Sequence, residues 1–100
     1  MSELCLTLLC PPTIEEKLLD LLLMLPSTTV FTSTPTAAHG VVVWDLSQTE
    51  QVMGRAHVTE IQVIFAAADK AILLDTIRQK LAGTGLRYWV TTVVEAGEIV

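Results

Sequence analysis

Two histidines, His39 and His57, are the side chains of this 100-residue chain whose type most directly suggests chemistry. They bracket a central segment, and closure of that segment could bring them together to bind a soft divalent metal with a cysteine or an aspartate. The spacings that usually mark such sites, C-x-x-C and H-x-x-x-H, do not occur in the sequence. The pattern therefore favours ordinary surface histidines, and a divalent-metal site stays as the alternative.

Arg55 is the only basic residue between positions 37 and 55. It could hold an anion or form an ion pair with Glu50, and the sequence favours the ion pair or simple exposure to solvent. Motifs of catalysis are absent, because the chain contains no G-x-S-x-G, P-loop or H-E-x-x-H pattern and no paired-carboxylate motif. We therefore expect no catalytic residues and a protein that is not an enzyme.

The composition indicates one globular domain with an acidic surface. Hydrophobic residues make up 51% of the chain, which is enough for a core that needs no disulfide or metal. Asp and Glu number 11 against 6 Lys and Arg, so the net charge is −5. Nucleic acids and anionic membranes bind positive surfaces, and this balance argues against both as partners.

Cys5 and Cys10 lie on one predicted strand, roughly 17 Å apart at about 3.3 Å per residue, which is beyond the reach of a disulfide. Two free thiols fit a reducing compartment. No secretory leader is expected, because Glu3 stands where basic residues belong and prolines follow the first apolar run directly. The apolar run 18–25 is shorter than the ~20 residues of a membrane-spanning helix. We expect a cytoplasmic protein.

Hydrophobic periodicity and chain-breaking residues predict four strands and two helices. Thr13 and Glu16 form a capping-box pattern before the first helix, and Asp69 is a suitable N-cap for the second. Pro35 should end the second strand, and Gly83 should end the second helix in a left-handed conformation. The strands are expected at residues 4–10, 28–34, 58–65 and 86–94, and the helices at 13–25 and 69–82.

The order of these elements predicts an α+β, ferredoxin-like β-α-β-β-α-β fold, with a four-stranded antiparallel sheet and two helices on one face. Right-handed crossovers place the first and third strands at the centre and the other two at the edges. Exposed strand edges can pair with another chain, so we expect an oligomer. Tyr88 and Trp89 alternate along the fourth strand, and we expect one in the core and the other in an interface.

A connection of unusual length, residues 35–57, joins the second and third strands. Connections in compact domains typically run ~2–6 residues, and longer ones are usually functional or disordered. Its first half holds an apolar run, Val41, Val42, Val43 and Trp44. This run could form an added strand against a neighbour, present Trp44 to a partner, or fold back on its own subunit.

Two motifs give the chain a resemblance to the PII-like superfamily, which includes nitrogen regulatory protein PII and ion-tolerance proteins of the CutA type. E-Q-V-M-G-R-A, residues 50–56, resembles the returning part of the PII loop. G-T-G-L-R-Y-W-V-T-T-V, residues 83–93, is similar to the PII pattern G-D-G-K-I-F-V-x-x-V. The E-Q-V-x-G-R and Y-W-V motifs look most like those of short uncharacterised PII-like proteins that are often encoded beside heavy-metal efflux systems.

The resemblance implies a single PII-like domain over residues 1–100, a homotrimer, and a non-catalytic regulatory role in signal transduction. The implied setting is heavy-metal homeostasis. The 35–57 loop would bind a partner protein. Glu50, in the E-Q-V-M-G-R-A motif of this loop, would belong to the partner-binding residues. The alternatives are a trimeric divalent-metal-binding protein of the ion-tolerance type, with His39 and His57 as ligands, and a structural assembly module.

The resemblance also implies a small effector, with an adenine nucleotide as the candidate, in clefts between subunits. Gly83 and Gly85 would let the backbone approach a phosphate group. Thr84 stands where the family pattern has an acid, and Arg87 would replace the family lysine as the phosphate partner. Arg55, at the base of the loop, completes the expected ligand contacts.

Overall fold

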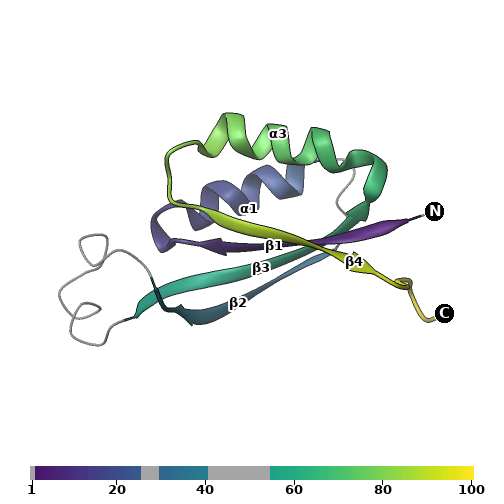
Figure 1. The fold of residues 1–100 in the computed structure, drawn as a ribbon, viewed down its shortest axis with the longest axis horizontal. Coiled ribbons are helices and arrows are strands. Elements are labelled where there is room, and N and C mark those ends of the chain that lie inside the picture. Colours follow the sequence, from purple (N-terminus) through teal and green to yellow (C-terminus); the bar gives the residue numbers. More distant parts are fainter. Residues whose placement is uncertain (1, 26–29, 41–54) are drawn as a thin grey trace.

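The computed structural model describes residues 2–25, 30–40 and 55–100. All three strand pairs are antiparallel, and the sheet has the order β2-β3-β1-β4. Both helices lie on the same face of this sheet (Figure 1). The predicted ferredoxin-like fold is confirmed, including the central places of β1 and β3. The elements are β1 (Glu3–Cys10), η1 (Pro12–Ile14), α1 (Glu15–Met24), β2 (Phe31–Ala38), β3 (Ala56–Ala66), η3 (Ala67–Asp69), α3 (Lys70–Leu81) and β4 (Arg87–Val93).

The core lies between the central strands and the two helices. Strand residues point alternately to the two faces, so every second residue of β1 and β3 can meet the helices. The register places Leu6 opposite Val63 and Leu8 opposite Ile61, and all four are buried. Burial of each such side chain contributes about 1.5–3 kcal/mol. The helices complete this core with Leu18, Leu22, Leu73, Leu74, Ile77 and Leu81.

The first helix begins differently from the prediction. The chain enters η1 at Pro12, and α1 starts only at Glu15, with Ile14 at its N-cap and no side-chain cap hydrogen bond. Pro12 explains the difference, because a proline with its fixed φ starts a helical turn readily. Thr13 therefore lies inside the first turn and cannot cap the helix from in front. The predicted capping box of Thr13 and Glu16 is wrong.

The second strand also departs from the prediction. It spans Phe31–Ala38, and Pro35 lies in its middle, paired with Thr59 of β3. A proline is tolerated there because β2 is an edge strand. On the outer side of an edge strand no neighbouring strand needs an N–H donor, so a proline there removes no hydrogen bond of the sheet. Pro35 therefore does not end the strand. Together with the earlier start of β3 at Ala56, this leaves residues 39–55 between the two strands.

The β2–β3 pair extends beyond the rest of the sheet at one end. The last residue of β1, Cys10, pairs with Thr59, whereas the pairing of β3 with β2 continues to Ala56 opposite Ala38. Figure 1 shows this end projecting away from the helices. In the part of the chain that the structure describes, no helix has the length and apolar character needed to cross a membrane.

Candidate functional site

The turn between α3 and β4 holds the glycines that the sequence singles out. Gly83 has φ +75° and Gly85 has φ +80°, a conformation that other residues rarely adopt. Between them, the hydroxyl group of Thr84 donates a hydrogen bond of 2.7 Å to the carbonyl oxygen of Leu81, one of the last carbonyls of α3. The predicted left-handed Gly83 after the helix is confirmed.

A cavity of about 200 Å³ lies beside this turn. Its walls come from the second half of α3, from β1 and from the start of β4, on the face of the sheet that carries the helices. Three predicted ligand residues, Gly83, Thr84 and Gly85, border it. Most of the remaining wall is apolar and consists of Leu8, Leu74, Ile77, Leu81, Ala82 and Leu86.

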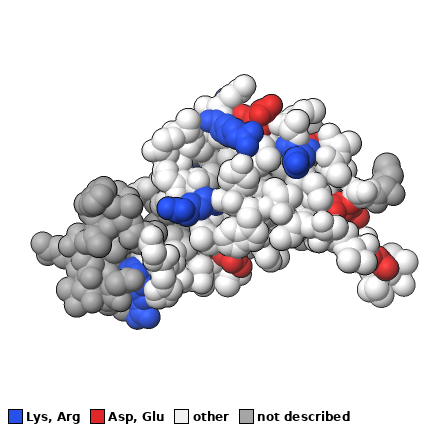
Figure 2. Space-filling model, viewed as in Figure 1, with Lys and Arg blue, Asp and Glu red and all other residues white. Residues whose placement is uncertain are grey.

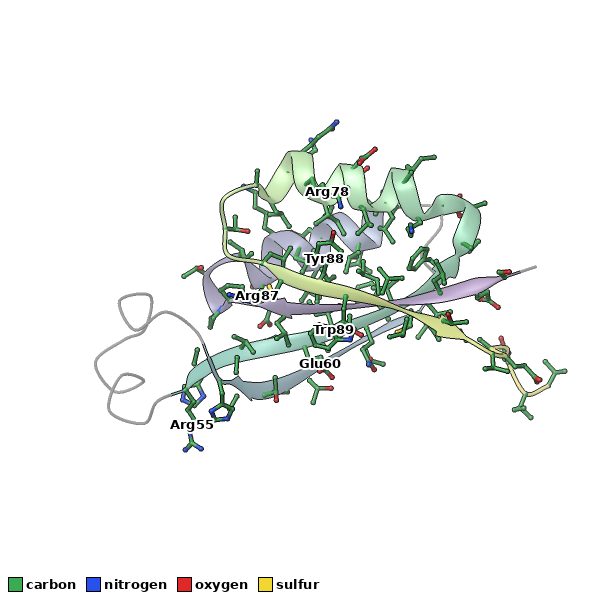
Figure 3. All side chains as sticks on the ribbon, in the orientation of Figure 1. Arg55, Glu60, Arg78, Arg87, Tyr88 and Trp89 are labelled. Carbon is green, nitrogen blue, oxygen red and sulfur yellow. The ribbon has the colours of Figure 1, made fainter. Side chains whose placement is uncertain are left out.

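Arg78 and Tyr88 form the polar part of the cavity wall. The Nη2 atom of Arg78 donates a hydrogen bond of 2.8 Å to the hydroxyl oxygen of Tyr88, and its guanidinium carbon lies 5.9 Å from the centre of the Tyr88 ring. Asp75 lies 3.4 Å from Nη1 of Arg78. The bond to Tyr88, and then Asp75, raise the pKa of Arg78, which stays charged. Figure 3 shows Arg78 on α3 and Tyr88 on β4.

Sequence reasoning missed this Arg78–Tyr88 pair. The sequence predicts for Arg78 only a favourable interaction with the negative end of the second helix, and the structure does place it among the basic residues of the last turn. The two residues are close only because α3 packs back over the strand that follows it. Their spacing matches no known motif, so no signal in the sequence could have paired them.

Arg87 and Trp89 lie on the other face of the sheet. Leu9 of β1 is opposite Arg87 on one side and Glu60 of β3 on the other, so these three residues form a row across the face without helices. Trp89 lies in the next row, opposite Thr7, and is 44% exposed. Arg87 is therefore separated by the sheet from the cavity that Gly83 and Gly85 border.

The expectation for the two aromatic residues is corrected in one respect. They do alternate across β4, and Trp89 lies on the open face, where an interface could form. Tyr88 lies on the helix side but is also 44% exposed, so it covers the margin of the core and does not enter it. The physical reason is that β4 is an edge strand, and only one neighbouring strand shields its side chains.

Arg55 stands just before β3, apart from the other predicted ligand residues. Its Nε atom is buried and has no hydrogen-bond partner among the described residues. From Glu60 back to Arg55, the strand direction covers roughly 17 Å at about 3.4 Å per residue. Figure 3 shows Arg55 at the projecting end of the β2–β3 pair and Arg87 nearer the helices. A single subunit therefore does not bring Arg55 to the 83–87 turn.

The two histidines lie at the same projecting end. His57 pairs with Ala37 in the sheet, and His39 follows directly after β2. Both are exposed. Within residues 2–25, 30–40 and 55–100, no group of three or more His, Cys, Asp or Glu side chains could hold a metal ion. The loop residues of the prediction, Val41, Val42, Val43, Trp44 and Glu50, lie outside the described residues.

The two cysteines are free thiols, as expected. Cys10 is fully buried in the core and donates a weak hydrogen bond of 3.4 Å to the carbonyl oxygen of Pro11. Burial, and then the nearby charge of Glu15, raise the pKa of Cys10 to about 11. The thiol is therefore protonated at neutral pH and a poor nucleophile.

Figure 2 shows charged residues of both signs on this face of the molecule. Lys and Arg lie over α3 and towards the end of the sheet where β4 begins, and acidic residues also lie over α3 and along the lower side of this view. Acidic residues mark the C-terminal tail at the opposite end, which carries Glu95 and Glu98.

The sheet order and the two helices on one face define a ferredoxin-like α+β fold, with a long connection between β2 and β3. The chain belongs to the family described as protein of unknown function DUF3240, which it matches over residues 1–100. Among curated proteins, no sequence match was found.

Solved structures of low sequence identity share this fold. A DUF3240 family protein from Shewanella baltica is 18% identical, with a TM-score of 0.83 and coverage of 100% of this chain and 99% of the other. GlnK of B. subtilis is 15% identical, with a TM-score of 0.64 and coverage of 94% and 87%. A protein of Thermus thermophilus described as PII-like and signalling is 15% identical, with a TM-score of 0.62 and coverage of 93% and 88%.

Proposed function

We propose that this protein is a non-catalytic, cytoplasmic regulator of the PII-like kind, which forms a homotrimer and binds a small effector in clefts between its subunits. A partner protein would bind through the connection between β2 and β3, and heavy-metal homeostasis is the proposed setting. The observation that carries the proposal is the open face of the sheet. This face holds Trp89 and Arg87 beside the glycine turn, and no described element covers it.

The apolar part of the open face supports assembly. Trp89 and Ile64 are 44% and 39% exposed, and Leu9 lies between their strands. Exposed apolar surface of this kind is stabilised when a second subunit covers it. The charged residues Arg87 and Glu60 lie on either side of Leu9, so two copies can present opposite charges to one another.

The separation of the ligand residues supports a site between subunits. Arg55 and the 83–87 turn lie too far apart in one subunit to hold the same small molecule. A neighbouring copy could bring its own Arg55 to the turn. The fork of the Arg87 guanidinium suits a phosphate, so an adenine nucleotide is the first candidate effector.

The alternative of a trimeric metal-binding protein has less support. His39 and His57 share one end of the sheet, but a metal site would need further ligands from residues outside those described or from another subunit. A purely structural assembly module would use the open face without any effector. We therefore favour the regulator.

Light scattering and calorimetry test the proposal. We expect a trimeric mass and heat of binding with at least one of ATP, ADP, AMP and cyclic AMP. Arg87→Ala should weaken that binding, whereas Arg78→Ala, on the opposite face, is the matched control and should leave it unchanged. A monomeric mass would contradict the intersubunit cleft. The absence of binding heat with all four nucleotides would contradict the nucleotide site.

Metal titration tests the alternative. Zinc or copper would be added while the fluorescence of the tryptophans is recorded, with the His39→Ala variant alongside. A saturable signal that His39→Ala abolishes would favour the metal-binding alternative over the regulator. If neither metal changes the tryptophan fluorescence of the unmodified protein or of His39→Ala, His39 is not a metal ligand.

A further inference from the structure

The cavity between α3 and β4 is formed within one subunit, on the face of the sheet opposite Arg87 and the proposed intersubunit cleft. Its floor is apolar, with Leu8 at 1% exposure and Leu74 at 8%. Leu81 and Leu86 continue the apolar wall towards the turn. A space of about 200 Å³ with such a lining suits the hydrocarbon part of a ligand.

The turn beside the cavity contains two glycines that have open space around them. At Gly83 and at Gly85, an added Cβ atom would meet no other atom within 4 Å. Both glycines have positive φ, so the backbone of the turn disfavours residues with a side chain at these two positions. The wall of the cavity on this side is therefore made largely of backbone.

The rim carries one cation with spare hydrogen-bonding capacity. Arg78 has five N–H donors, and its contacts in the structure are one hydrogen bond to Tyr88 and one ion pair with Asp75. The side chains of Arg78 and Asp75 are 58% and 64% exposed, so water screens their attraction. A ligand carboxylate can therefore bind Arg78 beside Asp75 or in place of it.

The end of α3 limits the charge of the ligand. The last turn of this helix borders the cavity, and its carbonyl groups give that end a partial negative charge. Asp75 adds another negative charge near Arg78. These negative charges oppose any anion here, and they oppose a polyphosphate more strongly than a ligand with one carboxylate that is paired with Arg78.

We propose that this cavity binds a small amphipathic carboxylate, with its hydrocarbon part against Leu8 and Leu74 and its carboxylate on Arg78. Since a non-hydrogen atom fills roughly 20–30 Å³ in a condensed phase, the space suits a ligand of about seven to ten such atoms. A medium-chain fatty acid has this size and charge. The site goes beyond the proposed nucleotide cleft, because the sheet separates it from Arg87.

Octanoate is the probe, and the amide signals of Gly83, Thr84 and Gly85 in ¹H–¹⁵N NMR spectra are the readout. We expect saturable shifts of these signals, with a Kd of about 0.1–1 mM for so small a ligand. Octan-1-ol and octylamine have the same chain with no charge and with a positive charge, and both should bind about tenfold more weakly or worse.

Variants separate this site from the proposed nucleotide cleft. Arg78→Gln should weaken octanoate binding about tenfold, and Arg78→Lys should restore part of it. Arg87→Gln is the matched control and should bind octanoate like the unmodified protein. Leu74→Trp should fill the cavity and block binding, and its thermal unfolding would show whether it folds. If Leu74→Trp does not fold, octanoate binding by the Arg78→Gln and Arg78→Lys variants tests the site.

Three outcomes would overturn the site. One is the absence of shifts at residues 83–85 with octanoate, another is equal binding of octylamine, and the third is no effect of Arg78→Gln. Nucleotide calorimetry on the same variants keeps the two proposals apart. Loss of nucleotide binding in Arg87→Ala with octanoate binding intact would support both sites as independent.

Discussion

The hydroxyl group of Thr59 in β3 donates a hydrogen bond to the carboxylate of Glu15 at the start of α1. The two residues are 44 positions apart in the chain. Thr59 lies on the face of the sheet that carries the helices, and Glu15 is in the first turn of α1, whose positive end favours an acid. This bond therefore ties the first helix to a central strand where no side-chain cap holds the helix.

A double-mutant cycle tests the bond between Thr59 and Glu15. Thr59→Val and Glu15→Gln should each destabilise the protein by about 0.5–2 kcal/mol, because each weakens or removes a charge-assisted hydrogen bond. The double variant should be less destabilised than the sum of the two, with a coupling free energy of about 0.5–1.5 kcal/mol in urea unfolding. Strict additivity would mean that the bond does not contribute to stability.

Gly83→Ala should destabilise the protein by about 1–2 kcal/mol, because an alanine at φ +75° is strained although there is room for its Cβ. Gly83→Asn should be milder, since asparagine tolerates the left-handed conformation. Gly97→Ala, at a glycine without positive φ, is the control and should change the free energy of unfolding by less than about 0.5 kcal/mol. Equal effects at Gly83 and Gly97 would contradict the role of backbone conformation.

Trp89→Asp should reduce assembly without unfolding the subunit. Trp89 lies on the open face and is 44% exposed in the single chain, so an aspartate is tolerated there but opposes an apolar interface. Ile72→Asp, on α3 and 67% exposed, is the matched control away from this face. Light scattering should show a lower mass for Trp89→Asp alone, and an unchanged mass would contradict an interface at the open face.

The buried thiol of Cys10 should make the protein less stable at alkaline pH. Burial raises its pKa from the ordinary value of 9.0 to about 11, so the folded protein holds the proton more tightly than the unfolded chain. The stabilisation is complete below about pH 9 and falls as the pH rises through about 11, by an amount of the order of 1–3 kcal/mol. Cys10→Ala should be less stable overall but lack this pH-dependent part, as measured by urea unfolding at several pH values. If the free energy of unfolding changes with pH in the same way in both proteins, Cys10 is not the source of the alkaline loss of stability.

The sequence predicted the elements whose patterns are local and strong. In the strand expected at residues 58–65, Ile61, Val63 and Phe65 stand at every second position, and all three are buried in β3. Gly83 marked the end of α3, because the chain needs a left-handed residue there. The predictions failed at Pro35 and Thr13. Pro35 does not end its strand because β2 is at the edge of the sheet, and Thr13 does not cap the first helix because a helical turn already begins at Pro12.

The candidate site could be predicted only as a set of residues. Gly83, Thr84 and Gly85 were identified together because they are neighbours in a motif, and they do border one cavity. Arg87 belongs to the same motif but lies on the other face of the sheet, since successive residues of a strand point in opposite directions. Where the motif suggested one site, the geometry divides its residues between two surfaces.

The sequence by itself determined the order of the strands and helices and the glycine turn after α3. These follow from periodicity and backbone preference, which act over a few neighbouring residues. Only the tertiary structure decided that Arg78 meets Tyr88, that Glu15 meets Thr59 and that Arg55 stands apart from the 83–87 turn. Such contacts depend on strand register and on how the helices lie over the sheet, and these are set by the packing of the whole core at once.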